Sequence, residues 1–220
     1  MITGTDSIFR LEHKNCVKFV EQFSTRSSFV TAFKKKYNLI SAYHATNLDR
    51  GELALLKKQG LKTSSPELLQ TLALTRFLSA EDPPDVRSEI KGDIERYISG
   101  GRFGYPNRGE INFGLNRQQL MDEFYHYLLF GPETLLPLAD QLKQKYSISF
   151  RQRMMNHGDH VMINAAIPVA DVDEEWIEAI YEYLVNGFSE CSLVYYNNLP
   201  AENILKIQKV KRPNDHLRLL

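Results

Sequence analysis

The chain has 220 residues, of which 43% are hydrophobic and 25% are charged, a composition typical of one large globular domain or two small ones. Its 27 basic and 27 acidic residues balance, so the whole-chain charge gives no argument for nonspecific capture of nucleic acid or of an anionic membrane. No segment approaches the roughly 18 to 20 apolar residues that span a bilayer, and residues 1–15 lack the apolar core of a signal peptide. We therefore expect a cytoplasmic protein without a membrane partner, while export by a route that leaves no N-terminal signal stays open.

The first 60 residues predict helices on both sides of one strand. Apolar residues recur at near-helical spacing from about Asn15 to Tyr37, and a serine-rich stretch near the middle can break this helix in two. The short apolar run that opens the segment Leu39 to Thr46 favours a strand. Asn47 or Asp49 can cap the helix that follows, and Gly60 ends it.

Helices and strands continue to alternate after residue 60. The glycine-rich stretch Ser99 to Gly109 predicts a long loop that carries basic and aromatic residues, where binding groups often lie. Asn116 is expected to cap one helix, and Pro132 to stand in the first turn of another. In chain order we expect helices over 66–79 and through 90–98, a strand over 110–115, helices over 118–127 and 133–145, a strand over 161–169, a helix over 173–185, and strands over 191–196 and 204–210.

The interspersed pattern, without an internal repeat, predicts an α+β fold. We expect a single domain over residues 1–220, built on a mixed, mostly antiparallel sheet with peripheral helices, in which residues 1–37 form an N-terminal helical extension. The loop from Ser99 to Gly109 is the one tempting domain boundary, but the strands on either side of it are too few for an independent core. Cys16 and Cys191 fit neither a disulfide framework nor a four-ligand zinc site, so we expect both to be small buried hydrophobes.

A polar pair stands at the end of the first long strand. Because side chains alternate between the faces of a strand, His44 and Thr46 share one face, and Tyr43 packs on the other. An imidazole donor and a hydroxyl two residues apart suit the hydroxyls of a ribose or the amide of a nicotinamide. The alternative is a structural histidine next to a threonine that only caps the following helix.

The sequence Tyr43-His44-Ala45-Thr46, a short helix and then Gly60-Leu61 resemble the first motif of the ADP-ribosyltransferase superfamily. In that motif a strand-borne His, followed two residues later by Ser or Thr, holds NAD. The match covers 42–61, the segment 110–116 resembles the second strand of that fold, and two late segments, Ile-Asn-Ala-Ala-Ile-Pro-Val and Leu-Pro-Ala-Glu-Asn-Ile-Leu-Lys-Ile, resemble its paired closing strands. The resemblance implies an ADP-ribosyltransferase-like split sheet, NAD as the substrate, and transfer of ADP-ribose to a macromolecular acceptor, protein or nucleic acid, with release of nicotinamide.

The resemblance also implies which residues bind NAD. His44 and Thr46 would hold it, and an aromatic ring on or after the second strand would stack on the nicotinamide. Phe113, Tyr105 and Tyr125 are the candidates for that ring, although each is also a plausible core residue. In the long loop, Arg108 and Arg102 would reach the pyrophosphate, for which a guanidinium is well matched, or would be solvated loop charges.

A glutamate completes the site that the resemblance implies, because breaking the N-glycosidic bond builds positive charge on the ribose. We assign this catalytic role to Glu133, together with His44, since a Gly-Pro turn would hold Glu133 at a helix start that keeps it ionised. Glu110 and Glu202 are competitors, and an acidic residue in a first helical turn is also common without any function. The chain lacks the Glu-x-Glu or Gln-x-Glu that many arginine-modifying members carry before a late strand.

Two other functions stay open. The chain can be a noncatalytic nucleotide-binding or protein-binding module on the same fold, which would use the loop from Ser99 to Gly109. It can also be a metal-dependent hydrolase, with His157, Asp159 and His160 as ligands, whereas the NAD site that we favour contains no metal ligand. Motifs of P-loop, dinucleotide-binding and serine hydrolase sites are absent from the sequence.

Overall fold

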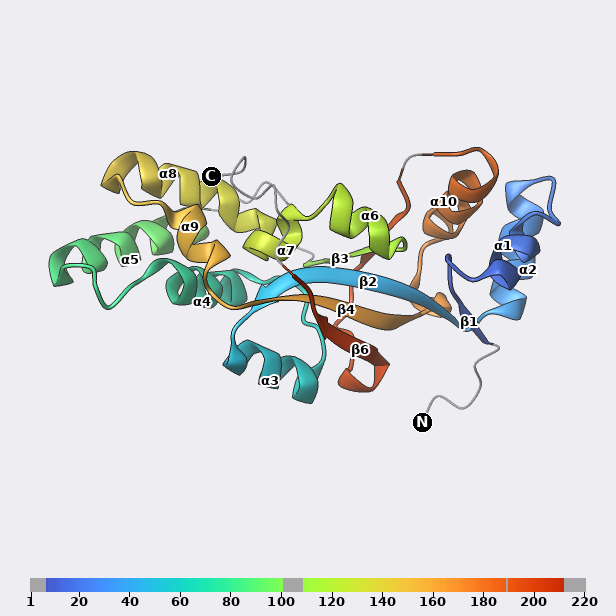
Figure 1. The fold of residues 1–220 in the computed structure, drawn as a ribbon, viewed down its shortest axis with the longest axis horizontal. Coiled ribbons are helices and arrows are strands. Elements are labelled where there is room, and N and C mark those ends of the chain that lie inside the picture. Colours follow the sequence, from blue (N-terminus) through green and yellow to red (C-terminus); the bar gives the residue numbers. More distant parts are fainter. Residues whose placement is uncertain (1–6, 101–108, 189, 212–220) are drawn as a thin grey trace.

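A computed structural model describes residues 7–100, 109–188 and 190–211, which form helices and one six-stranded sheet, as the α+β prediction requires (Figure 1). The sheet is mixed and mostly antiparallel, also as predicted: β2 pairs antiparallel with β3 and β4 and parallel with β1. Along the sheet the order is β5-β3-β2-β4-β6, with β1 beside β2 off this path. The strands are β1 (Ile8–Phe9), β2 (Leu39–Leu48), β3 (Ile111–Gly114), β4 (Asp159–Pro168), β5 (Ser192–Tyr195) and β6 (Ile204–Lys209).

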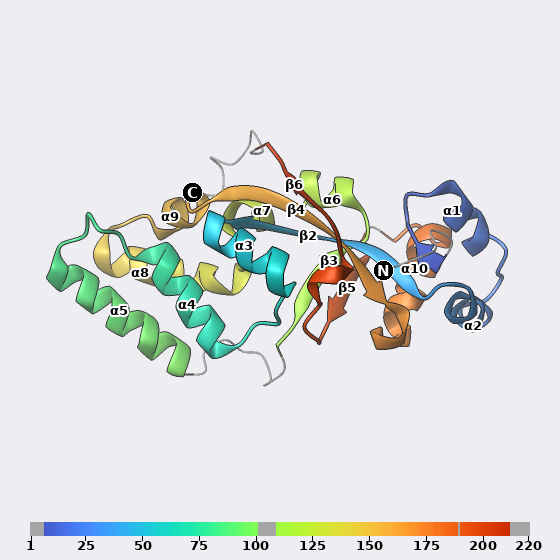
Figure 2. The same cartoon turned by 90° about the horizontal axis from the view of Figure 1, so that it is seen from below.

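The helices cover both faces and both ends of this sheet (Figures 1 and 2). In Figure 1, α1, α2 and α10 lie at one end, α4, α5, α8 and α9 at the other, α6 above the sheet and α3 below it. The α-helices are α1 (Lys14–Val20), α2 (Arg26–Lys36), α3 (Arg50–Gln59), α4 (Pro66–Phe77), α5 (Pro84–Ser99), α6 (Arg117–Asp122), α7 (His126–Phe130), α8 (Leu136–Tyr146), α9 (Phe150–Met155) and α10 (Glu174–Val185). Short 3-10 turns are η2 (Glu133–Leu135), η3 (Val169–Asp171) and η4 (Ala201–Asn203).

Strands β2 and β4 form the long central ladder. They pair over their whole length, from Leu39 opposite Pro168 to Leu48 opposite Asp159. β2 therefore runs two residues beyond the predicted strand end at Thr46, because its backbone continues to pair with β4. The two faces of this ladder carry different helices, and the candidate site residues divide between them.

One face of the ladder belongs to the larger core, which we call the sheet core. Ile40 and Ala42 of β2 are fully buried there against α1, α2 and α10, and further along the same face α3 packs Leu56 against β4. The opposite face carries Tyr43 and Ala45, which pack against α6 and α7. Alternation along β2 thus places His44 on the side of α3 and Tyr43 on the side of α6 and α7.

The second core, which we call the helical core, is built from helices at one end of the sheet. Its buried residues come from α4, α5, α7, η2, α8 and α9 and include Phe77, Ile94, Leu138 and Phe150. Burial of each large apolar side chain contributes about 1.5 to 3 kcal/mol. The helical core is therefore a substantial source of stability, separate from the sheet core.

The N-terminal helical extension predicted over residues 1–37 packs into the sheet core. As the sequence allowed, the helix breaks in its serine-rich middle, and α1 and α2 are the result. Phe29 and Phe33 of α2 are fully buried, and their rings lie 5.4 Å apart between centroids. Cys16 and Cys191 are buried, as predicted. In the described segments, no helix is both long and apolar enough to cross a membrane.

Two predicted helices differ from the observed ones, and one strand and one α-helix were not predicted. The helix expected over 118–127 ends at Asp122, and α7 starts separately at His126. The helix expected to start at Glu133 starts at Leu136 after a 3-10 turn, so Pro137 rather than Pro132 occupies its first turn. The unpredicted elements are β1, which has two residues, and α9, which has six.

Candidate functional site

His44 lies in the middle of β2, partly exposed, with its ring held by the neighbouring strand. Its Nδ1 is 2.8 Å from the carbonyl oxygen of Asn112, at the second position of β3. Burial lowers the pKa of His44 below 6.5, against the opposing effect of that hydrogen bond. The imidazole is therefore neutral at pH 7, with Nδ1 donating to Asn112 and Nε2 left as an acceptor. This differs from the predicted role of His44 as a donor to the ligand.

Phe113 and Thr46 lie near His44 but are closed to solvent. The ring of Phe113 meets that of His44 edge to face, with centroids 5.8 Å apart. Phe113 is 2% exposed and belongs to the sheet core, so it offers no free face for stacking on a nicotinamide. Thr46 is 6% exposed, and its hydroxyl donates to the carbonyl of Asn47. Of the predicted pair on this face, His44 alone is presented to a ligand, because α3 and the β4 ladder enclose Thr46.

Glu133 does not meet these residues. It lies in the 3-10 turn η2 with a side chain that is 56% exposed, 3.9 Å from Nε2 of His126. His126 opens α7, which packs on the face of β2 opposite His44. The prediction that a Gly-Pro turn holds Glu133 at the start of an α-helix is wrong, because α8 begins three residues later, at Leu136, and the carboxylate lies in solvent.

Glu110, the competing carboxylate, is linked to His44 through Asn112. The side-chain amide of Asn112 donates to Oε1 of Glu110 at 3.2 Å, while the carbonyl of the same Asn112 accepts from His44. Tyr105, Arg108 and Arg102 lie outside the described residues. Tyr125 is partly buried against the helical core, and Glu202 lies in the 3-10 turn η4 before β6.

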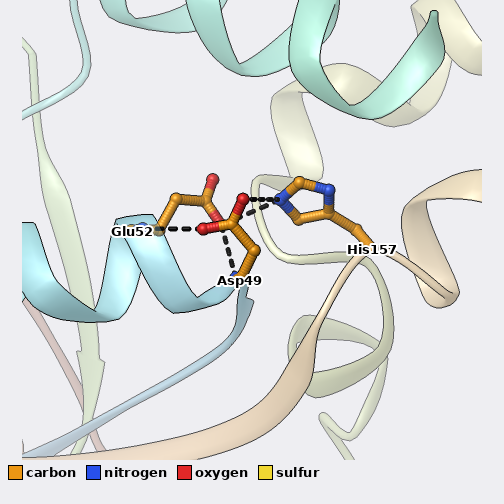
Figure 3. Close-up of side chains that lie close together, drawn as sticks. All are labelled: Asp49, Glu52 and His157. Atoms are coloured by element: carbon orange, nitrogen blue, oxygen red, sulfur yellow. Dashed lines mark hydrogen bonds and ion pairs between the residues drawn. The ribbon is translucent and has the colours of Figure 1, made fainter. Parts of the chain in front are cut away.

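A second group of polar side chains gathers where β2 ends and α3 begins (Figure 3). Asp49 caps α3 through a capping box: its Oδ1 accepts from the backbone N–H of Glu52 at 2.7 Å, and Oε2 of Glu52 accepts from the N–H of Asp49 at 2.9 Å. His157 reaches the same place from the loop between α9 and β4. Its Nε2 lies 2.9 Å from Oε2 of Glu52 and 3.8 Å from Oδ2 of Asp49. We call these three residues the cap cluster.

Two buried residues connect the cap cluster to the helical core. Arg76 of α4 is 3% exposed and donates to Oδ1 and the carbonyl of Asn47, to the carbonyl of Phe130, and to Oε1 of Glu52 at 3.2 Å. Asn47, fully buried on β2, donates to the carbonyls of Leu129 and Met154, both at 2.6 Å. These bonds tie the end of β2 to α4, α7 and α9.

The charges around Glu52 decide its protonation. Burial alone would raise the pKa of this carboxyl group. The hydrogen bond with His157 and the charge of Arg76 outweigh burial and lower the pKa to about 2. Glu52 is therefore ionised at every pH at which the protein is expected to work, and it pairs with two basic groups at once.

The cap cluster differs from the metal-ligand set that the sequence left open as an alternative. Within the described ranges, the His, Cys, Asp and Glu side chains close enough to share one metal ion are Asp49, Glu52 and His157. Asp159 instead pairs with Lys209 at 2.5 Å, and His160 lies on β4 opposite Asn47. His157 turns away from both, because the loop before β4 directs its ring towards α3.

Sequence reasoning missed Glu52 and Arg76, although each has a signal. The Asp-x-x-Glu spacing of Asp49 and Glu52 is that of a capping box. Arg76 stands among Leu69, Ala73 and Phe77, so it is a charged residue on an otherwise apolar helix face, which is rare unless the charge is paired. The partner across the chain, His157, carries no such signal.

Comparison with known proteins adds no assignment: no family model, no curated protein and no solved structure matches this chain. The function must therefore be argued from the site residues themselves.

Proposed function

We propose that the protein is an NAD-dependent ADP-ribosyltransferase, built on the split sheet of that superfamily, which moves ADP-ribose to a macromolecular acceptor. The observation that carries this proposal is His44: a neutral, partly exposed imidazole on the central strand, held through Nδ1 by the β3 carbonyl of Asn112. Its Nε2 is free to accept a hydrogen bond from a ribose hydroxyl.

The helix and Gly-Leu that follow His44 support the same proposal. α3 ends at Gly60, which has φ 78°, and Leu61 then pairs with Leu199 through two backbone hydrogen bonds of 2.9 Å. A Cβ atom at Gly60 would lie 1.9 Å from the carbonyl oxygen of Leu199. The glycine is thus required for the chain after α3 to pair with Leu199, and it stands where the motif has its Gly-Leu.

For the catalytic carboxylate we now favour Glu110 over Glu133. Glu110 is linked to His44 through Asn112, whose side chain binds Glu110 and whose carbonyl accepts from His44, whereas Glu133 is solvent-exposed and pairs with His126. In the proposed reaction the carboxylate stabilises the positive charge that develops on the ribose as nicotinamide leaves. Thr46 and Phe113 support the position of His44 from within the fold and do not contact NAD.

Incubation with NAD labelled in the adenylate part, together with protein and nucleic-acid acceptors, tests the proposal. We expect label transfer and nicotinamide release from the wild type, and a loss of at least about 100-fold in His44→Ala and Glu110→Gln. Glu133→Gln is the matched control and should keep its activity. If the wild type shows neither label transfer nor nicotinamide release, the proposed enzymatic activity is contradicted.

A noncatalytic binding module is the second candidate, and the absence of Glu133 from the surroundings of His44 favours it. Calorimetry separates the two functions. Saturable binding of NAD that His44→Ala abolishes, without nicotinamide release, would identify a binding module on the same fold.

A further inference from the structure

We propose that the cap cluster, Asp49, Glu52 and His157, is a binding site for a divalent transition-metal ion, with zinc as the best-matched ion. The site is distinct from His44 and does not depend on the proposed transferase activity. One imidazole and two carboxylates form a ligand set typical of zinc and related ions.

The spacing of the donor atoms fits one shared ion. Nε2 of His157 lies 2.9 Å from Oε2 of Glu52 and 3.8 Å from Oδ2 of Asp49, and the three donor atoms all lie within 4.8 Å of one another. With metal–ligand bonds of about 2.0 to 2.2 Å, neighbouring ligand atoms stand roughly 3 to 3.5 Å apart. Small side-chain rotations therefore suffice to place the three atoms around an ion.

Each carboxylate is already oriented through its other oxygen. Oδ1 of Asp49 accepts the N–H of Glu52, and Oε1 of Glu52 accepts from Arg76, which turns Oδ2 and Oε2 towards His157. Ligand carboxylates in metal sites are commonly fixed by such outer contacts. The side chain of His157 is 8% exposed, while that of Asp49 is 38% exposed and leaves a route from solvent.

An independent observation comes from Arg76. Its Nη1 donates to Oδ1 of Asn47 and the carbonyl of Phe130, and its Nη2 donates to the carbonyl of Asn47 and Oε1 of Glu52. The Nε of Arg76 is buried, and the described atoms give it no hydrogen-bond partner. Nε belongs to the same guanidinium whose Nη2 holds Glu52, so its unused N–H can donate to a water molecule that completes the coordination of the ion.

Binding the ion changes the hydrogen bonds of the cluster without changing the fold. The Nε2 lone pair of His157 must face the metal, so the Nε2 proton moves to Nδ1 or leaves to solvent, and the hydrogen bond to Glu52 is replaced by two metal bonds. Since the ligands come from the start of α3 and the loop before β4, the ion would also link these two segments.

Titration calorimetry of the chelator-treated full chain with zinc tests the site. We expect one equivalent to bind, the melting temperature to rise with zinc, and cobalt in place of zinc to give a visible absorption band. Asp49→Asn and Glu52→Gln should each weaken binding by at least about 100-fold, more than is usual for an outer contact. The amide oxygen of each variant still accepts the capping hydrogen bond, but the NH2 group of Glu52→Gln takes the place of the oxygen that accepts from Arg76, so the metal-free melting temperature of each variant is measured first.

Asp159→Asn is the matched control, because this carboxylate is close to His157 in sequence but pairs with Lys209. It should bind zinc as the wild type does. The proposal is overturned if the wild type takes up no zinc, or if the two amide variants bind zinc as tightly as the wild type while their metal-free melting temperatures show that they are folded. Either result would leave the cap cluster as a charge-paired helix cap.

Discussion

The two cores of this protein are built from different parts of the chain and are joined in different ways. The buried residues of the helical core all fall between Leu69 and Met155. The sheet core combines segments from Phe9 to Leu199, and its aromatic rings pack directly on one another at centroid distances such as 5.0 Å for Phe9 and Phe33. Apolar burial holds each core, whereas Arg76 and Asn47 carry buried hydrogen bonds between them. The comparison shows that the joint between the cores combines apolar contacts, such as those in the cluster of Ala45 and Leu128, with buried hydrogen bonds whose geometry tolerates less change than packing does.

Removal of Arg76 is expected to have the largest effect on this joint. Arg76→Met leaves Glu52 and two buried carbonyls without their donor, which should cost about 3 to 5 kcal/mol of unfolding free energy. Urea denaturation measures this cost, and hydrogen exchange should rise first in α4 and α7. The exposed Arg87→Met serves as the control and should stay within about 0.5 kcal/mol of the wild type. A loss below about 1 kcal/mol for Arg76→Met would show that the joint is not polar in origin.

Substitution of Gly131 tests the same hydrogen bonds by adding a side-chain atom next to Arg76 and Asn47. At Gly131, with φ 70°, a Cβ atom would lie 2.4 Å from Nη1 of Arg76 and 2.9 Å from Oδ1 of Asn47. Gly187 has nearly the same φ, 69°, with nothing within 4 Å. Both alanine variants should lose stability through backbone strain at a positive φ, and Gly131→Ala should lose roughly 2 kcal/mol more by displacing Arg76. Equal thermal stability of the two variants would contradict this account.

Acid should weaken the link between Glu52 and its partners. The folded pKa of about 2 lies below the ordinary 4.5, so the unfolded chain binds more protons between these values. The stabilisation is present above pH 4.5 and is lost as the pH falls towards 2. Between pH 5 and 3 the wild type should lose about 1 to 2 kcal/mol more than Glu52→Gln, allowing for partial solvent screening. Urea titrations at the two pH values measure the difference, and parallel losses in both proteins would exclude Glu52 as the source.

The helix cap at Asp49 should have the smallest effect. Asp49→Ala removes the acceptor for the N–H of Glu52 and is expected to cost about 1 kcal/mol. Asp49→Asn keeps an acceptor and should stay within about 0.5 kcal/mol of the metal-free wild type. Thermal melts in the presence of a chelator compare the two. If Asn costs as much as Ala, the negative charge rather than the hydrogen bond maintains the start of α3.

The sequence predicts most of the fold because periodicity and end signals are local. β2, α3, α5 and α10 follow from runs of apolar residues with a cap or a glycine at the end. β1 is too short to show alternation, and α9 too short to show a helical period. The 3-10 turn that delays α8 depends on tertiary packing around Gly131, which no local pattern encodes.

The candidate sites are predictable only where one segment supplies the residues. Alternation along β2 gives the face of His44 correctly, but the enclosure of Thr46 depends on how α3 and β4 pack over it. The cap cluster needs His157, which reaches Glu52 only because β2 and β4 pair in one particular register, with Leu48 opposite Asp159. The whole sheet sets this register. The sequence around Glu52 and the sequence around His157 therefore contain no local pattern that predicts their contact.

The position of β2 has a consequence for synthesis of the chain. This central strand is made early, yet its antiparallel partners β3 and β4 begin at Ile111 and Asp159. The residues of the helical core are close in sequence, and all of them have been synthesised once Met155 has left the ribosome. At that stage β4 has not been synthesised, so one edge of β2 is unpaired. An exposed strand edge pairs readily with other chains, so a nascent chain halted before residue 159 is the species most in need of a chaperone.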